Sequence, residues 1–365
     1  MSEWQTFCLK DLGKIVGGAT PPTNNPKNYG NKIAWITPKD LSTLQGRYIK
    51  KGSRSISRLG FKSCSCVLLP KHAILFSSRA PIGYVAISKK RLCTNQGFKS
   101  IIPNKKIYFE FLYYLLKYHK DNISNIGGGT TFKEVSGATL GLFEVKIPPT
   151  YYEQQKIART LSILDQKIEN NHKINELLHT LAYKIYEYYF KYKPKNAKLE
   201  QIIIENPKSS IMVKNAQKTQ DKYPFFTSGD NILSYPKAII DGRNCFLNTG
   251  GNTGIKFYVG KASYSTDTWC ICANEFSDYL YLLLSSIKTH INQSFFQGTS
   301  LKHLQKNLLK KYPIYMPSAH EIKKFNQIIM PLLTLISINT RTSKKLEQIR
   351  DFLLPLLLTQ QVKPE

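Results

Sequence analysis

The chain has 365 residues, and its 52 Lys and Arg against 24 Asp and Glu leave a net charge of +28. With 42% hydrophobic and 12% aromatic residues it can bury cores, which excludes a disordered basic tail. Its length is typical of two or three domains. A charge this large favours an acidic partner, with nucleic acid ahead of an anionic membrane. A composition simply rich in Lys throughout is the competing explanation.

Targeting and metal signals are missing from the sequence. A membrane span takes about 20 apolar residues, and the apolar run Phe352–Leu358 is interrupted by Pro355. The stretch Met1–Gly13 mixes charged with apolar residues and does not resemble a signal peptide. The pairs Cys64/Cys66 and Cys270/Cys272 have a C-x-C spacing that zinc sites do not favour. We therefore expect a cytoplasmic protein with buried thiols and no metal.

The N-terminal part of the chain, 1–150, has the pattern of a mixed α/β module. Short apolar runs separated by Gly, Pro and Ser turns are typical of strands. The expected strands are Ile33–Ile36, Cys66–Leu69, Ala73–Phe76, Tyr84–Ile87 and Glu144–Pro148. One helix is predicted for Tyr108–His119.

A long helical pattern follows, from about Tyr152 to Lys193, which would extend over roughly 60 Å. Its apolar residues recur at alternating spacings of four and three, the pattern of a coiled-coil seam. Polar residues occupy the middle of the seam, where a polar layer costs stability and fixes register.

The whole scheme then repeats. The segment Gly129–Lys133 recurs further along the chain as Gly298–Lys302. Strand-like runs at Phe225–Thr227, Cys245–Asn248 and Pro313–Pro317 match those of the first module, and Asp278–Ser286 matches its helix. Adding 168 to the first seam gives a second seam in residues 325–357. Pro331 and Pro355 lie inside this second pattern, so we expect them to kink or fray it.

Matching seams predict that the two helices pair with each other in antiparallel fashion; two unrelated helices, each with its own core face, are the alternative. The predicted pairing residues are Ile157, Leu161, Leu164, Ile168, Asn171, Leu178, Ile329, Leu332, Ile336, Asn339 and Leu346. The expected fold is α+β, with two mixed α/β domains separated by a pair of long antiparallel coiled-coil helices and a pseudo-two-fold internal repeat. The expected segments are a first module (1–150), a first long helix (151–193), a second module (194–318) and a second long helix (319–362).

Catalytic motifs are not recognisable. The glycines at 127–129 lack the Lys-Ser/Thr of a phosphate-binding loop, and Gly250–Gly254 does not follow dinucleotide-binding spacing. Ile147–Thr150 lacks both the first polar residue and the final aromatic residue of an amino-methyltransferase loop. No paired acids support a metal nuclease at Glu144, and no Ser-His-Asp set is apparent. The chain is predicted to be non-catalytic.

Loops rich in donors and acceptors are better candidates for function. Lys and Arg suit phosphates and guanine edges, Asn and Gln suit adenine, and small hydroxyls suit phosphates. Loops of this composition are also ordinary turns. The candidate DNA-binding residues of the first module are Lys39, Ser77, Arg79, Asn95, Gln96, Thr130, Thr131 and Lys133. Those of the second are Thr227, Asn248, Asn252, Thr266, Thr268, Thr299, Ser300 and Lys302.

Several of these segments together resemble one family, the specificity (S) subunits of type I restriction-modification systems. The segments that carry the resemblance are Pro38–Asp40, Ile74–Gly83, Thr94–Phe98, Gly129–Thr131, Ile147–Pro149, Glu153–Ile157 and Arg350–Leu357. The resemblance covers essentially the whole chain and is weaker in residues 196–296.

The resemblance implies two target recognition domains, each reading one half of a split DNA sequence, with the helices setting their separation. It implies no catalytic centre and no cofactor on this chain. The expected partners are double-stranded DNA, two modification subunits that methylate adenine with S-adenosylmethionine, and ATP- and Mg-dependent restriction subunits. Half-sites about one helical turn apart, roughly 34–36 Å, are expected. A specificity subunit of a fused methylase-nuclease or an orphan methyltransferase, or a non-specific basic scaffold, remain alternatives.

The distribution of charge along the chain favours DNA binding over a uniformly Lys-rich composition as the cause of the positive charge. Residues 1–152 hold 23 basic and 7 acidic residues, and residues 194–318 hold 15 and 8. The helical segments are nearly balanced, with 7 and 5 in 153–193 and 7 and 4 in 319–365. The modules therefore carry most of the positive charge, and the first module carries more than the second.

Overall fold

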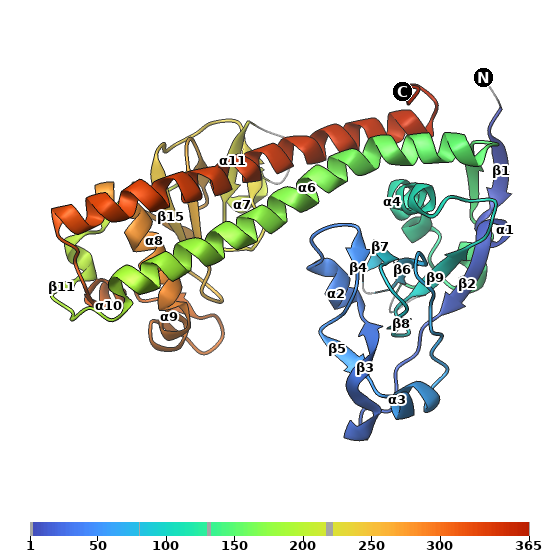
Figure 1. The fold of residues 1–365 in the computed structure, drawn as a ribbon, viewed down its shortest axis with the longest axis horizontal. Helices are drawn as coiled ribbons and strands as arrows, with labels where there is room; N and C mark the ends of the chain where they lie inside the picture. The colour runs from blue at the N-terminus through green and yellow to red at the C-terminus, as the bar shows by residue number, and fades with distance from the viewer. Residues whose placement is uncertain (1–2, 80, 130–132, 217–221, 365) are drawn as a thin grey trace. The chain divides into compact units, whose positions relative to one another are not determined.

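The computed structural model describes residues 3–79, 81–129, 133–216 and 222–364. Its contacts divide the chain into two units, Met1–Asn170 with Ser343–Glu365, and Asn171–Thr342. Each unit combines one α/β module with a segment of each long helix, α6 (Tyr151–Tyr186) and α11 (Ala319–Leu358) (Figure 1). Among the described residues, none of the helices is both long and apolar enough to span a bilayer.

The first module is built on two sheets. Its larger sheet has the order β2 (Gly13–Gly17), β9 (Lys99–Pro103), β6 (Ile74–Ser78), β7 (Ile82–Ser88) and β4 (Tyr48–Ile49). The smaller sheet consists of β5 (Arg54–Ile56), β3 (Tyr29–Ile36) and β8 (Cys93–Thr94). A separate antiparallel pair joins β1 (Gln5–Cys8) to β10 (Glu144–Ile147). The helices are α1 (Leu9–Leu12), η1 (Pro26–Asn28), α2 (Pro38–Ser42), α3 (Arg58–Lys62), α4 (Phe109–Asn125) and α5 (Gly137–Gly141).

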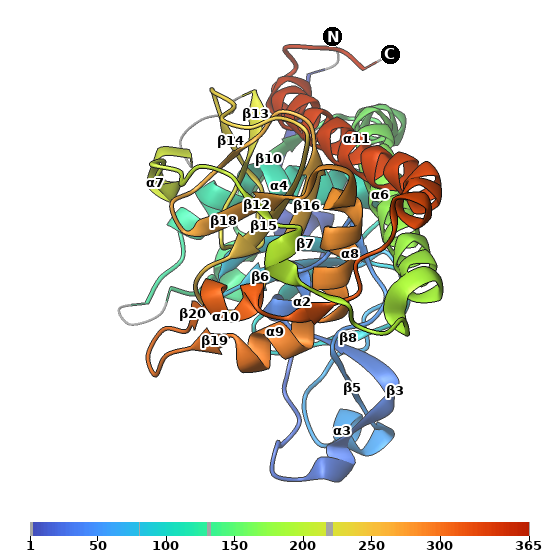
Figure 2. The ribbon, with the colours of Figure 1, turned by 90° about the vertical axis from the view of Figure 1, so that its left-hand side faces the viewer.

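The second module repeats this arrangement. Its larger sheet has the order β12 (Ile204–Glu205), β18 (Thr268–Cys272), β15 (Arg243–Asn248) and β16 (Ile255–Val259). Its smaller sheet consists of β14 (Leu233–Tyr235), β13 (Tyr223–Phe226) and β17 (Ser263–Tyr264). Two strand pairs complete it, β11 (Ala197–Lys198) with β21 (Pro313–Ile314) and β19 (Phe296–Gln297) with β20 (His303–Leu304). The helices are η3 (Leu199–Gln201), α7 (Val213–Ala216), η4 (Asn274–Phe276), α8 (Ser277–Ser286), α9 (Lys288–Ser294) and α10 (Lys306–Lys310) (Figure 2).

The internal repeat predicted from the sequence is confirmed by the strand order. The order β2-β9-β6-β7 in the larger sheet of the first module corresponds to β12-β18-β15-β16 in the second. The strands β6 and β15 each lie between two antiparallel neighbours, one of which is the next strand along the chain. In each smaller sheet the central strand has one antiparallel and one parallel neighbour. The two modules are therefore copies of one fold.

One predicted strand is wrong. The segment Cys66–Leu69 is irregular apart from an isolated bridge between Leu69 and Leu92. Its apolar character has another cause, because Cys66 and Leu69 are buried in two separate clusters of the first module. A short apolar run reports burial, and burial does not require a strand.

The long helices pair in antiparallel fashion within each unit. In the first unit, Ile157 and Leu161 of α6 share a core with Leu354 and Leu357 of α11. In the second unit, Phe325 and Ile329 of α11 share a core with the end of α6 and with α8. The start of α6 therefore meets the end of α11, and the end of α6 meets the start of α11, as Figure 1 shows for each unit.

The predicted pairing residues occupy these helix interfaces to different extents. Buried residues are Ile157, Leu161, Ile168, Ile329 and Ile336, while Leu164, Asn171, Leu178, Leu332, Asn339 and Leu346 are half-buried. A polar layer lies where the sequence places it in the second unit, because the amide of Asn339 donates to Asn175 Oδ1 at 2.9 Å. Asn175 Nδ2 in turn approaches Thr340 Oγ1 at 3.4 Å.

Of the kinking or fraying expected at the prolines of the second helix, the fraying is wrong. Residues 319–358 form one continuous helix through Pro331 and Pro355. Pro331 is exposed, so water can satisfy the carbonyl that the missing N–H leaves free. The irregularity lies in the first helix instead, which ends in a π-helical turn, Glu187–Lys191.

Both long helices begin with a hydroxyl cap, at corresponding positions of the internal repeat. Thr150 Oγ1 accepts from the backbone N of Glu153, and Ser318 Oγ accepts from that of Glu321. The Glu321 carboxylate accepts in return from the Ser318 N–H at 2.9 Å and from the Tyr315 hydroxyl. The Ser318 backbone hydrogen bond, followed by the Tyr315 and Ser318 hydroxyls, lowers the pKa of Glu321 from 4.5 to about 2.

This cap predicts a pH-dependent contribution to stability. Because the pKa of Glu321 is lower in the folded state, the ionised carboxylate stabilises the fold above pH 4.5, and this contribution is lost as the pH falls towards 2. Glu321→Gln keeps an acceptor in the capping box but removes the charge. We expect the variant to be less stable than the wild type at neutral pH, with the difference shrinking below pH 4.5 in urea titrations. Parallel stability curves across this range would contradict the assignment.

Candidate nucleic-acid interface

Three loops that are far apart in the first module's sequence meet at one place. They are the β6–β7 loop, the turn after β8 at residues 95–97, and the chain on either side of a bridge between Gly128 and Glu134. The backbone of Ser78 connects all three, because its N–H donates to Gly97 O at 2.8 Å and its carbonyl accepts from Val135 N at 3.0 Å. The long-range pairing of the β-sheet thus assembles the cluster.

Several predicted residues of the first module hold these loops in shape. Ser77 is fully buried; its hydroxyl donates to Pro81 O and accepts from Tyr84 N, both at 2.8 Å. Asn95 Oδ1 accepts from Gly97 N at 3.0 Å. Arg79 is half-buried beside Glu134, at 3.7 Å between Nη1 and Oε2. In the structure these side chains therefore contact other groups of the same chain.

Other predicted residues of this module face solvent. Lys39 on α2, Gln96 and Lys133 are exposed. Gln96 Oε1 accepts a hydrogen bond from the Thr20 hydroxyl. Thr130 and Thr131 lie outside the described residues.

The second module assembles the equivalent three loops. They are the β15–β16 loop, the turn between β17 and β18, and the β19–β20 hairpin. Gly251 N donates to Lys302 O at 2.9 Å, and Thr249 Oγ1 donates to Asp267 O at 2.7 Å. Leu304 N donates to Thr249 O at 3.0 Å. The residue Thr249 therefore connects this cluster much as Ser78 connects the first.

The predicted residues of the second module divide in the same way. Asn248 is buried, and its amide donates to Asn252 O at 3.0 Å across the β15–β16 loop, as Ser77 does across the β6–β7 loop. Thr227 accepts from Gly229 N, and Thr268 lies beside Ser265 Oγ at 2.9 Å, and both are buried. The exposed predicted residues are Asn252, Thr266, Thr299, Ser300 and Lys302.

The structure adds residues that the sequence motifs missed. Lys256 on β16 donates its Nζ to Thr227 O at 2.7 Å and to Asn248 Oδ1 at 3.3 Å. Burial lowers the pKa of this amine. Thr20 contacts Gln96, and Lys99 lies 3.2 Å from Glu134. None of these lies in a loop motif, because strand pairing brings them to the clusters, and only the three-dimensional fold reveals their place.

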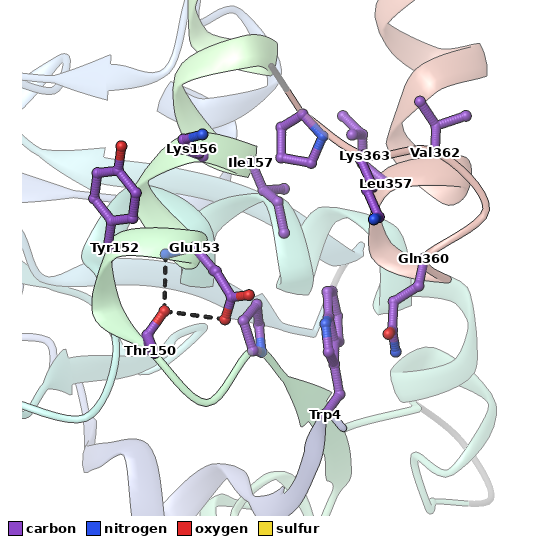
Figure 3. Close-up of a pocket in the computed structure, with 12 residues that line it drawn as sticks. Trp4, Thr150, Tyr152, Glu153, Lys156, Ile157, Leu357, Gln360, Val362 and Lys363 are labelled. Atoms are coloured by element: carbon purple, nitrogen blue, oxygen red, sulfur yellow. Dashed lines mark hydrogen bonds between the residues drawn. The ribbon is translucent and has the colours of Figure 1, made fainter. Parts of the chain in front are cut away.

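A groove of about 490 Å³ lies elsewhere in the first unit. The residue Trp4, the first turns of α6 and the segment after α11 line it, with Lys156, Leu357 and Lys363 among the lining side chains (Figure 3). It contains none of the predicted DNA-binding residues. Over the residues described, no group of three or more His, Cys, Asp and Glu has the arrangement of a metal site.

The amino-acid sequence is similar to that of a known class of proteins with a specificity domain. Residues 1–180 and 195–348 match the type I restriction modification DNA specificity domain. The chain is 32% identical over 410 aligned positions to a type I restriction enzyme specificity subunit of Methanocaldococcus jannaschii, covering all of this chain and 94% of that protein. It is 22% identical to a putative type I specificity subunit of Mycoplasma genitalium, covering 84% of this chain and 80% of the other.

The fold agrees with this relationship. A crystal structure of a type I restriction-modification S subunit from M. genitalium superposes with a TM-score of 0.63 at 18% identity, covering 97% of this chain and 96% of that one. The chain therefore belongs to the specificity subunits of type I restriction-modification systems. Members of this family are the non-catalytic subunits of such systems, as the sequence predicts for this chain.

Proposed function

We propose that this chain gives a type I restriction-modification complex its DNA sequence specificity by reading a bipartite target, one half-site with each module. The observation that carries the proposal is the duplicated three-loop cluster, which exposes Gln96 and Lys133 in one module and Asn252 and Lys302 in the other. Lysines suit phosphate oxygens, and side-chain amides suit the edge of adenine.

Exposed and buried predicted residues take different roles in this proposal. Exposed lysines and hydroxyls bind the DNA backbone, and exposed amides read bases. Ser77 and Asn248 are buried and hydrogen-bonded across the loops, so they act by shaping the loops that carry the contacting residues. Substituting them would change recognition through the loop conformation.

The salt dependence of DNA binding tests the backbone contacts. Lys133→Ala and Lys302→Ala each remove one exposed ammonium from equivalent positions of the two clusters. If each lysine neutralises one phosphate, the slope of log K against log salt falls by about 0.9 per substitution, and binding weakens on specific and unrelated duplexes alike. Lys345→Ala, on the exposed face of α11, is the matched control. An unchanged slope in both the Lys133→Ala and Lys302→Ala variants would exclude phosphate contacts there.

The proposed partners are two adenine-methylating modification subunits and restriction subunits, with S-adenosylmethionine, ATP and Mg bound by those partners. Supporting this is an apolar stripe in the second unit, defined by Ile174, Leu177 and Leu181 of α6 and Tyr188 of the π-helical turn that follows it. These side chains are 43%, 71%, 49% and 86% exposed and recur at helical spacing. Large exposed apolar stripes of this kind mark protein interaction surfaces.

Leu177→Glu places a charge in the middle of that stripe. We expect the variant to fold normally, because Leu177 is exposed, but to lose co-purification with the modification subunits. Thr180→Glu, at a neighbouring exposed position on the same helix, is the control for added charge. Full complex formation by Leu177→Glu would remove the stripe from the partner interface.

A further inference from the structure

In each module an arginine forms hydrogen bonds both to a helix of the module and to one of the two long helices. In the first unit, Arg47 donates Nη1 to Glu110 of α4 at 3.2 Å and Nε to Glu169 of α6 at 3.1 Å. In the second unit, Arg243 binds the carboxylate of Asp278 on α8 through Nε and Nη2. Its Nη1 also donates to Thr334 Oγ1 of α11 at 2.9 Å.

The positions of these contacts follow the internal repeat. Glu110 is the second residue of α4, and Asp278 is the second residue of α8. They lie 168 residues apart, which is also the offset between the two helix seams. That offset also relates Glu169 to Ser337 on the two long helices. Glu169 Oε1 accepts from Arg47 N at 2.9 Å, and Ser337 Oγ accepts from Val259 N at 3.0 Å. The same helical position therefore accepts a module backbone N–H in both units.

A glycine with positive φ lies at each junction. Gly46 has a φ of 120°, and a Cβ there would lie 2.9 Å from Glu169 Cγ. Gly260 has a φ of 121°, and a Cβ there would lie 2.8 Å from Nη1 of Arg341, which donates to Val259 O at 3.0 Å. The positive φ favours glycine at both junctions.

The charged groups at the junctions are largely withdrawn from water. The Arg47 side chain is 5% exposed, Glu169 is 12% exposed and Asp278 is 2% exposed. Buried charges are tolerated when their hydrogen bonds are made in one geometry, so tilting the module on the helix would expose an unpaired charge. The helix partner is a carboxylate in the first unit and a neutral hydroxyl, Thr334, in the second.

We propose that Arg47 and Arg243, with Glu169 and Ser337, are positioning residues that hold each module in one orientation on its long helix, and that this orientation confines recognition to one gap length between half-sites. The inference rests on the proposed function, since a gap exists only if each module reads one half-site. One extra base pair moves a half-site by about 3.4 Å and turns it by about a tenth of a helical turn. A firmly held module rejects such a displacement, and a loosened one accepts it.

The experiment uses the complete methylating complex and duplexes that carry the wild-type half-sites at the wild-type gap and at gaps one base pair shorter and longer. The variants are Gly46→Ala, Glu169→Ala and, as a mild substitution that preserves folding, Thr334→Val. We expect the preference for the wild-type gap to fall by about tenfold in the first two, since about 1.4 kcal/mol corresponds to a factor of ten. The fall should be smaller for Thr334→Val. Gly30→Ala, where a Cβ would be at ordinary contact distance, is the control.

Half-site sequences should stay unchanged in every variant, because the base-reading loops are untouched. Variants that methylate all gap lengths more slowly with unchanged gap preference would overturn the positioning role, since a loss of stability alone has that effect. An unchanged Thr334→Val complex together with unfolded Gly46→Ala and Glu169→Ala complexes would also count against it. A wild-type complex without any gap preference would instead contradict the proposed function.

Discussion

Replacing Asp165 with alanine is expected to lower the free energy of unfolding by about 3–5 kcal/mol. Asp165 lies on α6 in the first unit, its side chain is 5% exposed, and Arg350 Nη1 of α11 donates to it at 2.7 Å. The Tyr114 hydroxyl of α4 donates to its other oxygen at 2.6 Å. Removing the carboxylate leaves Nη1 of a buried guanidinium and a buried hydroxyl without the acceptor that they have in the fold, and this desolvation penalty accounts for the size of the effect.

The matched control uses the same arginine. Asp351 also binds Arg350, but its side chain is 55% exposed, so Asp351→Ala should cost less than about 1 kcal/mol. Urea denaturation followed by circular dichroism measures both variants. Equal and small losses for the two substitutions would show that the buried contact contributes no more than the exposed one, contrary to this account.

The second large effect is expected at Phe190, in the π-helical turn that ends α6. Its ring is 2% exposed and packs edge-on against Tyr279 at 5.2 Å and Phe325 at 4.9 Å between ring centroids. Phe190→Ala removes the ring that joins α6, α8 and α11 in the second unit. Large-to-small substitutions of buried aromatics cost about 3–5 kcal/mol.

Tyr188 provides the contrast two positions away. Its side chain is 86% exposed, so Tyr188→Ala should change the free energy of unfolding by less than about 0.5 kcal/mol. Thermal and urea denaturation of the two variants should therefore separate clearly. A comparable loss at Tyr188, or a negligible one at Phe190, would mean that the π-helical turn does not direct the aromatic side chains as described.

The internal repeat and the helix seams were predictable because they depend on periodicity. The residues Ile157 and Ile329 recur at coiled-coil spacing in matching segments, and that spacing alone places them on the paired faces. The loop motifs at Arg79, Asn95 and Lys133 were predictable as separate turns. Their assembly into one cluster was not, because it depends on strand pairing between residues far apart in sequence, as at Ser78.

Errors in the prediction have equally local causes. The run Cys66–Leu69 is apolar because it is buried, and burial carries no information on strand pairing. Pro331 was expected to disturb its helix, but it lies on an exposed side where the lost hydrogen bond can be replaced by water. The contacts of Arg47 and Arg243 could not be predicted, because neither residue lies in a sequence motif. Only the fold brings them to Glu169 and Thr334.

The proposed function requires that the two modules read two halves of one split DNA target. Methylome sequencing of cells with and without this gene tests it most directly, because it returns every methylated sequence that depends on the chain. We expect adenine methylation at two short defined sequences separated by a fixed number of unspecified base pairs. A single continuous recognition sequence, or methylation that does not depend on sequence, would contradict it.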